Sequence, residues 1–159
     1  MTSRICKDCL KELDIEMFDH QTNKKGDFVR SVCRKCQQLN RNINLSKTPE
    51  SFLKNLYTQL KSTRRNSEYK WDISVEYINQ LYKKQNGKCA ISGVNMTWHK
   101  GSGKTHYNIS IDRKNPDLDY VPTNVQLVCV IINIMKHTLN DVDFYWWCKT
   151  IVDNKEKDI

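Results

Sequence analysis

The chain has 159 residues and carries 26 Lys and Arg against 18 Asp and Glu, which gives a net charge of +8. This length allows one moderate core plus a small accessory unit and excludes two full-sized globular domains. No run of about 18 apolar residues occurs and the first residues are polar, so we expect neither a membrane span nor a secretory signal. The charge favours a polyanionic partner. We expect a cytoplasmic protein. A phage protein that acts inside its host cell is consistent with this expectation.

Four of the seven cysteines form two Cys-x2-Cys units, Cys6 with Cys9 and Cys33 with Cys36. The odd count and this pairing favour thiolates on one structural zinc ion over a secreted disulfide framework. Four reduced cysteines without a metal are the alternative. We predict a four-cysteine zinc knuckle and linker over residues 1–47, with a thin apolar layer made by Leu13, Ile15, Met17, Phe18 and Phe28.

Residues 48–159 are predicted to form the second unit, which opens with two helices. Thr48 offers a capping hydroxyl and Pro49 suits the first helical position, and apolar residues then recur every four positions, which predicts a helix over 50–63. A second helix is predicted over 74–85, with Asn86-Gly87 as its stop. Basic residues cluster at and after the end of the first helix.

A strand, a second strand and a helix follow in that order. The loop-like composition of 93–104 gives way to NISID at 108–112, whose alternation predicts a strand, and VQLV at 125–128 predicts another. Residues 129–138 have helical character. A last helix over 141–152, capped by Asn140, lines up Phe144, Trp147, Cys148 and Ile151 and is predicted to pack on the core. The expected fold class is α+β, a small knuckle followed by a mostly helical domain.

Three segments of the second unit together carry a family pattern: KQNGKCAISGVNM (84–96), NISIDRKNPDLDYVPTNVQLVC (108–129) and VIINIMKH (130–137). They resemble the phage and restriction-type branch of the HNH endonucleases, also called the ββα-metal or His-Me finger family, in which a four-cysteine knuckle can precede the catalytic module. The resemblance implies an endonuclease that hydrolyses phosphodiester bonds in double-stranded DNA. It also implies that Asp112 and Asn133 hold a catalytic Mg²⁺ or Mn²⁺ ion, and that Asn124 fastens the loop between the strands.

The first departure from the family pattern concerns the general base. Many HNH enzymes place a histidine directly after the aspartate, whereas this chain has Arg113, which stays protonated and is better suited to clamp a phosphate. His106 is our first candidate for the base because an imidazole titrates near neutrality. His99, Tyr107 and Tyr120 are the next candidates, and the absence of any base is the alternative.

The second departure concerns a second zinc site. Related modules often carry two further Cys-x2-Cys pairs, but here the pairs are Cys89-x2-Ser92 and Cys129-x2-Ile132. We predict that Cys89 and Cys129 are buried thiols without zinc. Apolar packing around Val130, Ile132 and Trp147 is expected to replace the metal.

Basic residues in both units are candidate DNA contacts because they suit phosphates. They are Arg30, Arg34, Lys35, Arg41, Arg64, Arg65 and Lys70. Two other functions stay open: an HNH scaffold that binds nucleic acid without cutting it, and a zinc-stabilised adaptor that binds protein through its aromatic last helix. Four successive aromatic residues (144–147) cannot all face one core, so Tyr145 or Trp146 is expected to be exposed or to lie in a homodimer interface.

Overall fold

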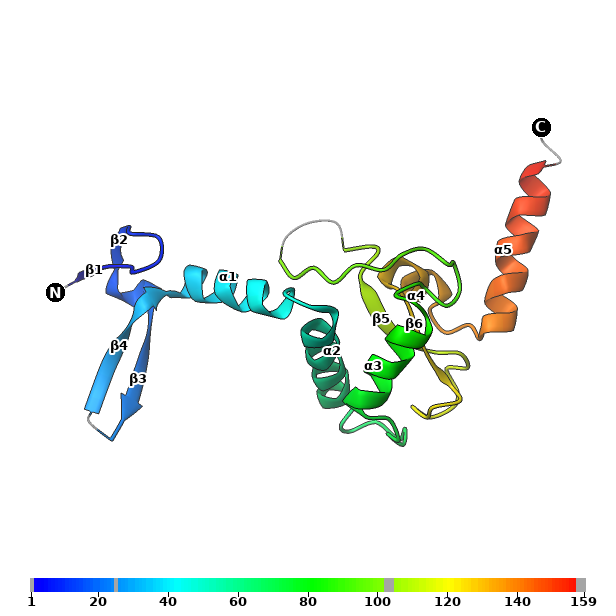
Figure 1. The fold of residues 1–159 in the computed structure, drawn as a ribbon, viewed down its shortest axis with the longest axis horizontal. Coiled ribbons are helices and arrows are strands. Elements are labelled where there is room, and N and C mark those ends of the chain that lie inside the picture. Colours follow the sequence, from blue (N-terminus) through cyan, green and yellow to red (C-terminus); the bar gives the residue numbers. More distant parts are fainter. Residues whose placement is uncertain (1, 25, 102–104, 157–159) are drawn as a thin grey trace.

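A computed structural model describes residues 2–24, 26–101 and 105–156, and Figure 1 shows the arrangement of its elements. The cysteine-rich unit lies at one end, helix α1 (Arg34–Leu45) leads from it to a larger body, and helix α5 (Asp141–Lys155) leaves the body at the other end. Two separate clusters of buried apolar residues, one in each unit, form the cores. The predicted α+β class is therefore confirmed, while the boundary between 47 and 48 stays a prediction.

Two antiparallel hairpins build the N-terminal unit. Strands β1 (Ser3–Ile5) and β2 (Glu12–Asp14) pair first, a 3-10 turn follows at Ile15–Met17, and strands β3 (Phe18–Asn23) and β4 (Gly26–Cys33) pair next. Phe18 is fully buried beside the cysteines, as predicted. Met17 and Phe28 are 56% and 41% exposed, so their predicted place in the apolar layer is wrong. The hairpins are too small to cover more than one large side chain.

Helix α1 was not predicted. Its sequence RKCQQLNRNINL is mostly polar, and none of its residues is buried. The helix begins at Arg34, directly after Cys33, so the second cysteine pair spans its start. The metal-binding turn therefore fixes the first turn of this helix, which is the costly step of helix formation.

Helix α2 (Pro49–Thr63) and helix α3 (Val75–Lys84) form as predicted. The Thr48 side chain accepts a hydrogen bond from the backbone N–H of Ser51, and the Ser51 hydroxyl accepts one from the backbone N–H of Thr48. These two hydrogen bonds form a capping box. Helix α3 ends before Asn86 and Gly87, which both adopt the left-handed backbone conformation that stops a helix.

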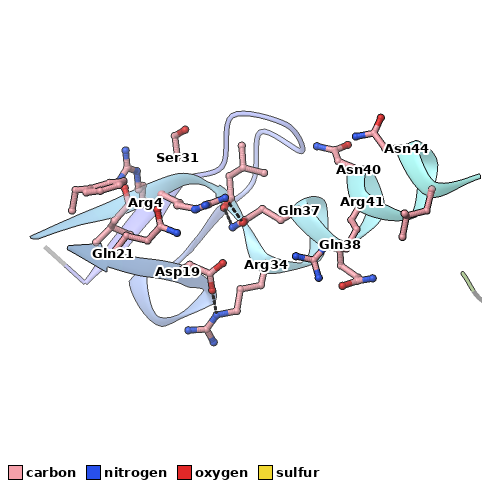
Figure 2. A pocket seen from close by; sticks show the side chains of 15 residues that line it. Arg4, Asp19, Gln21, Ser31, Arg34, Gln37, Gln38, Asn40, Arg41 and Asn44 are labelled. Atoms are coloured by element: carbon pink, nitrogen blue, oxygen red, sulfur yellow. Dashed lines mark hydrogen bonds and ion pairs between the residues drawn. The ribbon is translucent and has the colours of Figure 1, made fainter. Parts of the chain in front are cut away.

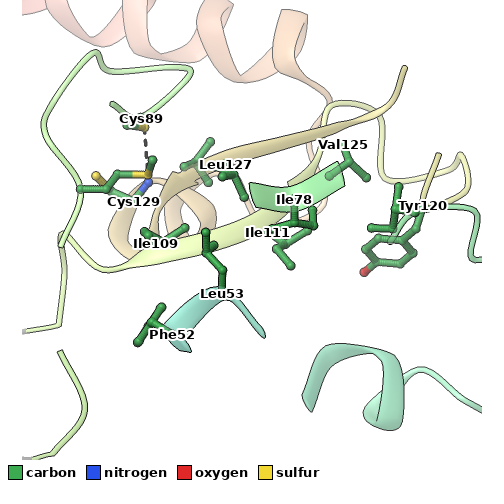
Figure 3. Close-up of a cluster of buried hydrophobic side chains, with 13 residues drawn as sticks. Phe52, Leu53, Ile78, Cys89, Ile109, Ile111, Tyr120, Val125, Leu127 and Cys129 are labelled. Atoms are coloured by element: carbon green, nitrogen blue, oxygen red, sulfur yellow. Dashed lines mark hydrogen bonds between the residues drawn. The ribbon is translucent and has the colours of Figure 1, made fainter. Parts of the chain in front are cut away.

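The two predicted strands pair as an antiparallel hairpin, β5 (Ile109–Arg113) with β6 (Val125–Cys129), and Asp112 lies opposite Gln126. Helix α4 (Val130–Lys136) follows β6 directly. Figure 3 shows the apolar side chains of this hairpin facing Phe52 and Leu53 of α2. The opposite side of β5 faces α4, and this strand and helix hold the residues of the candidate site.

Helix α5 is capped by Asn140, whose side chain accepts from the backbone N–H of Asp143, as predicted. Only Phe144 of this helix is buried, whereas Trp147 is 50% and Ile151 is 60% exposed. The prediction that the helix packs on the core is therefore wrong beyond its first turn, because the helix axis points away from the body (Figure 1). Among the described residues, no helix is long and apolar enough to cross a lipid bilayer.

Candidate metal centre and active site

The four predicted zinc ligands come together in the N-terminal unit. The sulfur atoms of Cys6, Cys9, Cys33 and Cys36 all lie within 4.8 Å of one another. Four thiolates on a tetrahedral zinc ion, each about 2.3 Å from the metal, are separated by about 3.8 Å, so the cluster fits such an ion. It is the one group of three or more metal-ligating side chains within the described part of the chain.

Backbone amides prepare the cluster for a metal. N–H groups of Cys33 and Cys9 donate to the sulfur of Cys6 and lower its pKa to about 6. A side-chain hydrogen bond with Cys33 raises the pKa of Cys36 to about 12. Zinc binds cysteine as the thiolate, so metal binding to this cluster would release protons.

Beside the cysteines lies an open groove of about 1040 Å³ between hairpin β3–β4 and helix α1. Figure 2 shows Arg4, Arg34 and Arg41 along it, and Arg30 lines it too. Arg34 pairs with Asp19 at 3.0 Å, but the side chains are largely exposed, so the pair contributes little stability. The predicted contacts Arg30, Arg34 and Arg41 therefore share one surface, whereas Lys35 is not part of the groove.

In the body, Asp112 is buried with a lysine that the sequence pattern had not singled out. The Nζ atom of Lys136 lies 3.0 and 3.2 Å from the two carboxylate oxygens, and Gln126 donates to the same carboxylate at 2.9 Å. Lys136 is only 1% exposed and also contacts Asp141 at 3.2 Å. The Asn-x-x-Lys pattern of 133–136 was the signal that could have identified this residue.

Asn133 lies one turn before Lys136 on the same face of α4 and donates to the Ser110 hydroxyl at 2.7 Å. Ser110 and Asp112 are two positions apart on β5, so their side chains face the same side of the strand. The predicted pair Asp112 and Asn133 thus lies along one β5–α4 seam. Within the described residues nothing donates to the carboxamide oxygen of Asn133, while the carboxylate of Asp112 is held by Lys136.

These donors fit a hard cation in chemistry, since Mg²⁺ prefers carboxylate and carboxamide oxygens. An ion on Asp112 has to take the place that the Lys136 ammonium holds on the carboxylate. Asn124 has a different task. Its side chain accepts from the backbone N–H of Asn115 and donates to the carbonyls of Asn115 and Asp119, which ties the loop between β5 and β6.

A cleft of about 540 Å³ opens at the end of β5. Its walls include Ser110, Asn133, Arg113, Arg64 and an exposed histidine, His137. The guanidinium of Arg113 stacks on Tyr69 at 3.9 Å and lies 4.9 Å from the Tyr120 ring. The guanidinium also donates a hydrogen bond to the carbonyl of Leu118. Together with the ring stacking, this bond fixes the positive charge of Arg113 in the cleft wall.

His137 was quoted in the predicted helix but not considered as a base. It follows α4 directly with a φ of 49°, and its side chain and that of Asn133 line the same cleft. Its place at the end of the segment VIINIMKH was the available signal.

The candidate base His106 is placed elsewhere. It is exposed, and it precedes the start of β5 while Asp112 lies near the end of that strand, so roughly 10 Å of strand separates them. His99 and Tyr107 also precede β5. Tyr120 is buried beneath Arg113 and Trp71.

Of the three predicted DNA-contacting residues after α2, one lines the cleft and two lie outside it. Arg64 lines the cleft, whereas Arg65 and Lys70 are exposed and are not part of its wall. Lys70 is positioned through its backbone, which donates to Asp119 at 2.9 Å.

Cys89 and Cys129 are both buried thiols, as predicted. The backbone N–H of Cys129 donates to the Cys89 sulfur at 3.3 Å (Figure 3), and burial raises the pKa of Cys129 to about 11. Burial also raises the pKa of Cys89, but hydrogen bonds from Ser92 and from the backbone of Cys129 and Ile91 together outweigh it, so the pKa of that thiol is lowered. Ile132 packs on the core, whereas half-exposed Trp147 does not, so its predicted part in this packing is wrong.

Comparisons with known proteins give a weak structural likeness and no match in sequence. A scan of protein families finds no match, and no curated protein matches the sequence significantly. A solved structure of the rare-cutting HNH restriction endonuclease PacI is similar over 95% of this chain and 94% of that chain, with 13% sequence identity and a TM-score of 0.43. A likeness at this level carries no inference about activity.

Proposed function

We propose that the protein is a DNA endonuclease that hydrolyses phosphodiester bonds in double-stranded DNA with the help of a divalent cation. The observation that carries the proposal is the β5–β6–α4 unit, which places Asp112 and Asn133 on one seam beside a cleft that holds fixed positive charge. Buried acids, amides and cations converging on a cleft are typical of sites for phosphoryl chemistry.

The side chains of the cleft wall and the buried carboxylate of Asp112, which lies on the seam behind that wall, each have a task in this proposal. Asp112 and Asn133 would hold a Mg²⁺ or Mn²⁺ ion, which when bound neutralises charge on the scissile phosphate and the leaving oxygen. Arg113 binds a non-bridging phosphate oxygen, because its guanidinium is fixed by Tyr69 and stays charged. Arg64, on the same cleft wall, binds a neighbouring phosphate.

We assign the general base to His137 and not to His106. His137 shares the cleft with Asn133 and Arg113, and its imidazole is exposed there, where it can contact an attacking water. His106 lies before the start of β5 and outside that cleft.

The N-terminal unit supplies DNA affinity in this proposal. A structural zinc ion on its four cysteines holds β4 and α1 in place, and these elements present the guanidinium groups of Arg30, Arg34 and Arg41. Residues 1–47 would thus act as a binding unit and residues 48–159 as the nuclease unit. Lys35, Arg65 and Lys70 would contact phosphates outside the groove and the cleft.

The test is incubation of the zinc-loaded protein with supercoiled plasmid and Mg²⁺ or Mn²⁺. We expect nicked or linear DNA, at least about a hundredfold slower cleavage with Asp112→Asn, and unchanged cleavage with the matched control Asp153→Asn, which alters an exposed carboxylate on α5. His137→Gln should slow cleavage about a hundredfold while His106→Gln leaves it unchanged. Equal, metal-independent activity of the wild type and Asp112→Asn would refute the proposal.

Binding without cleavage is the second candidate function, and one observation favours it. Lys136 already neutralises Asp112, and its buried ammonium competes with a divalent ion for the same oxygens. Under this alternative the protein binds plasmid with steep salt dependence and leaves it intact with every divalent ion tried.

A further inference from the structure

We propose that helix α5 is the dimerisation element of this protein and that its apolar surface packs against α5 of a second copy. The inference is independent of the nuclease activity, and it rests on the exposure, charge and placement of this one helix.

The exposed surface of α5 is unusually apolar. Six of its large apolar side chains are at least half exposed: Val142, Tyr145, Trp146, Trp147, Ile151 and Val152. They lie on more than one side of the helix, and Trp146 and Trp147 stack edge to face at 4.8 Å on its surface. Scattered single apolar residues on a surface need no explanation, but six of them gathered on one projecting helix mark an interaction surface.

The helix is not covered by its own body. Phe144, at its first turn, is its one buried residue, and beyond that point the helix projects away from β5, β6 and α4 (Figure 1). An isolated helix of 15 residues is marginally stable in water, so the projecting part needs a partner to be well ordered. Because it projects, a partner helix can approach it without meeting the body.

The charge of α5 argues for a second copy and against nucleic acid. The chain carries +8, whereas α5 holds three acids, Asp141, Asp143 and Asp153, against two lysines, Lys149 and Lys155. This part of the surface therefore lacks the excess positive charge that a phosphate backbone or an anionic membrane attracts. Two copies of a basic protein repel least where they meet through such a near-neutral surface.

The distribution of these charges favours antiparallel pairing. Asp141 and Asp143 lie in the first turn, while the second half holds Lys149 and Lys155 against Asp153 and carries a net charge of +1. In an antiparallel pair the acidic end of each helix faces the lysine-bearing half of its partner. A two-fold interface of this kind needs only one self-complementary surface, which is the commonest arrangement in homodimers.

The six exposed residues set an upper bound on the interface area. With aromatic side chains contributing about 150–250 Å² each when fully covered, they offer on the order of 700 Å² per copy. Because they lie on more than one side of α5, a single partner helix covers only part of this area, so the interface is smaller than a standard one, which buries about 800 Å² on each partner. If the proposed nuclease function holds, the dimer carries two clefts, one for each DNA strand.

The test measures mass and not cleavage, so its outcome is separate from that of the nuclease assay. Sedimentation equilibrium of the purified, zinc-loaded full chain should give twice the 18.8 kDa monomer mass at about 10 µM, an ordinary affinity for such an area. Trp147→Glu and Ile151→Lys should each shift the protein to monomer. Both side chains are exposed in one copy, so any loss of far-UV circular dichroism signal should be confined to the helical content of α5.

The matched control is Met17→Glu, which puts the same charge on a similarly exposed apolar residue of the N-terminal unit and should leave the dimer intact. A monomer mass for the wild type up to about 100 µM overturns the proposal. So does a dimer that survives both α5 substitutions. Binding of the wild-type monomer to neutral phosphatidylcholine vesicles, lost with Trp147→Glu, would assign the same surface to lipid and would also overturn it.

Discussion

The buried ammonium of Lys136 is predicted to be the most stability-critical charge in the body. Its Nζ atom contacts both oxygens of Asp112 at 3.0 and 3.2 Å and an oxygen of Asp141 at 3.2 Å. Lys136→Met keeps most of the side-chain length and removes the charge. Asp112 is 6% exposed, and among the described residues Gln126 is then its one remaining side-chain donor.

Breaking a buried pair from one side costs about 3–5 kcal/mol, because the remaining charge is neither solvated nor neutralised. We therefore expect Lys136→Met to lower the free energy of unfolding by that amount, a large share of the roughly 5–15 kcal/mol that ordinary domains possess. Replacing both charges, as Lys136→Met with Asp112→Asn, should be less damaging than the sum of the single changes by about 1–3 kcal/mol.

The assay is urea unfolding followed by tryptophan fluorescence, which reports on the body because all four tryptophans lie beyond residue 70. Lys84→Met, at an exposed lysine of α3, is the matched control and should change stability by less than about 0.5 kcal/mol. A loss below about 1 kcal/mol for Lys136→Met, or strict additivity in the double variant, would refute the reasoning that this lysine compensates a buried carboxylate.

The zinc cluster, Arg113 and Cys129 each lead to a further prediction. Chelation of zinc should unfold the two N-terminal hairpins, which lowers the far-UV circular dichroism signal, while tryptophan fluorescence stays unchanged. If both signals are lost together, the two units do not fold separately. Arg113→Ala, which removes the stacking on Tyr69, should cost about 1 kcal/mol of stability and at least about tenfold in plasmid cleavage, whereas equal cleavage would exclude a phosphate contact. The pKa of Cys129 is raised from 9.0 to about 11 in the folded state. The protonated thiol therefore contributes its full stability below pH 9, and this contribution is lost as the pH rises toward 11. Over that pH range the urea midpoint should fall more steeply in the wild type than in Cys129→Ala.

Local pattern determined much of this protein from the sequence alone. The cluster of four cysteines, helices α2 and α3 with their caps, and the β5–β6–α4 order follow from short-range spacing, and the structure has all of them. Each depends on interactions between residues close in the chain or on a strict repeat, so no knowledge of distant contacts was needed.

Tertiary structure decided what surrounds those elements. The sequence could not reveal that Lys136 neutralises Asp112, because the two residues meet only when α4 packs on β5. It placed the base at His106, whereas the cleft contains His137, since the cleft exists only after the loop and α4 close around the end of β5.

The last helix shows the same limit most clearly. Its apolar residues predicted a packed helix, and the structure leaves Trp147 and Ile151 exposed. Apolar side chains specify that a surface must be covered, but whether the cover is the chain's own core or another molecule depends on the direction in which the helix leaves the body. That direction is set by the turn at His137 to Asn140 and by the seating of Phe144, which are long-range features of the folded protein.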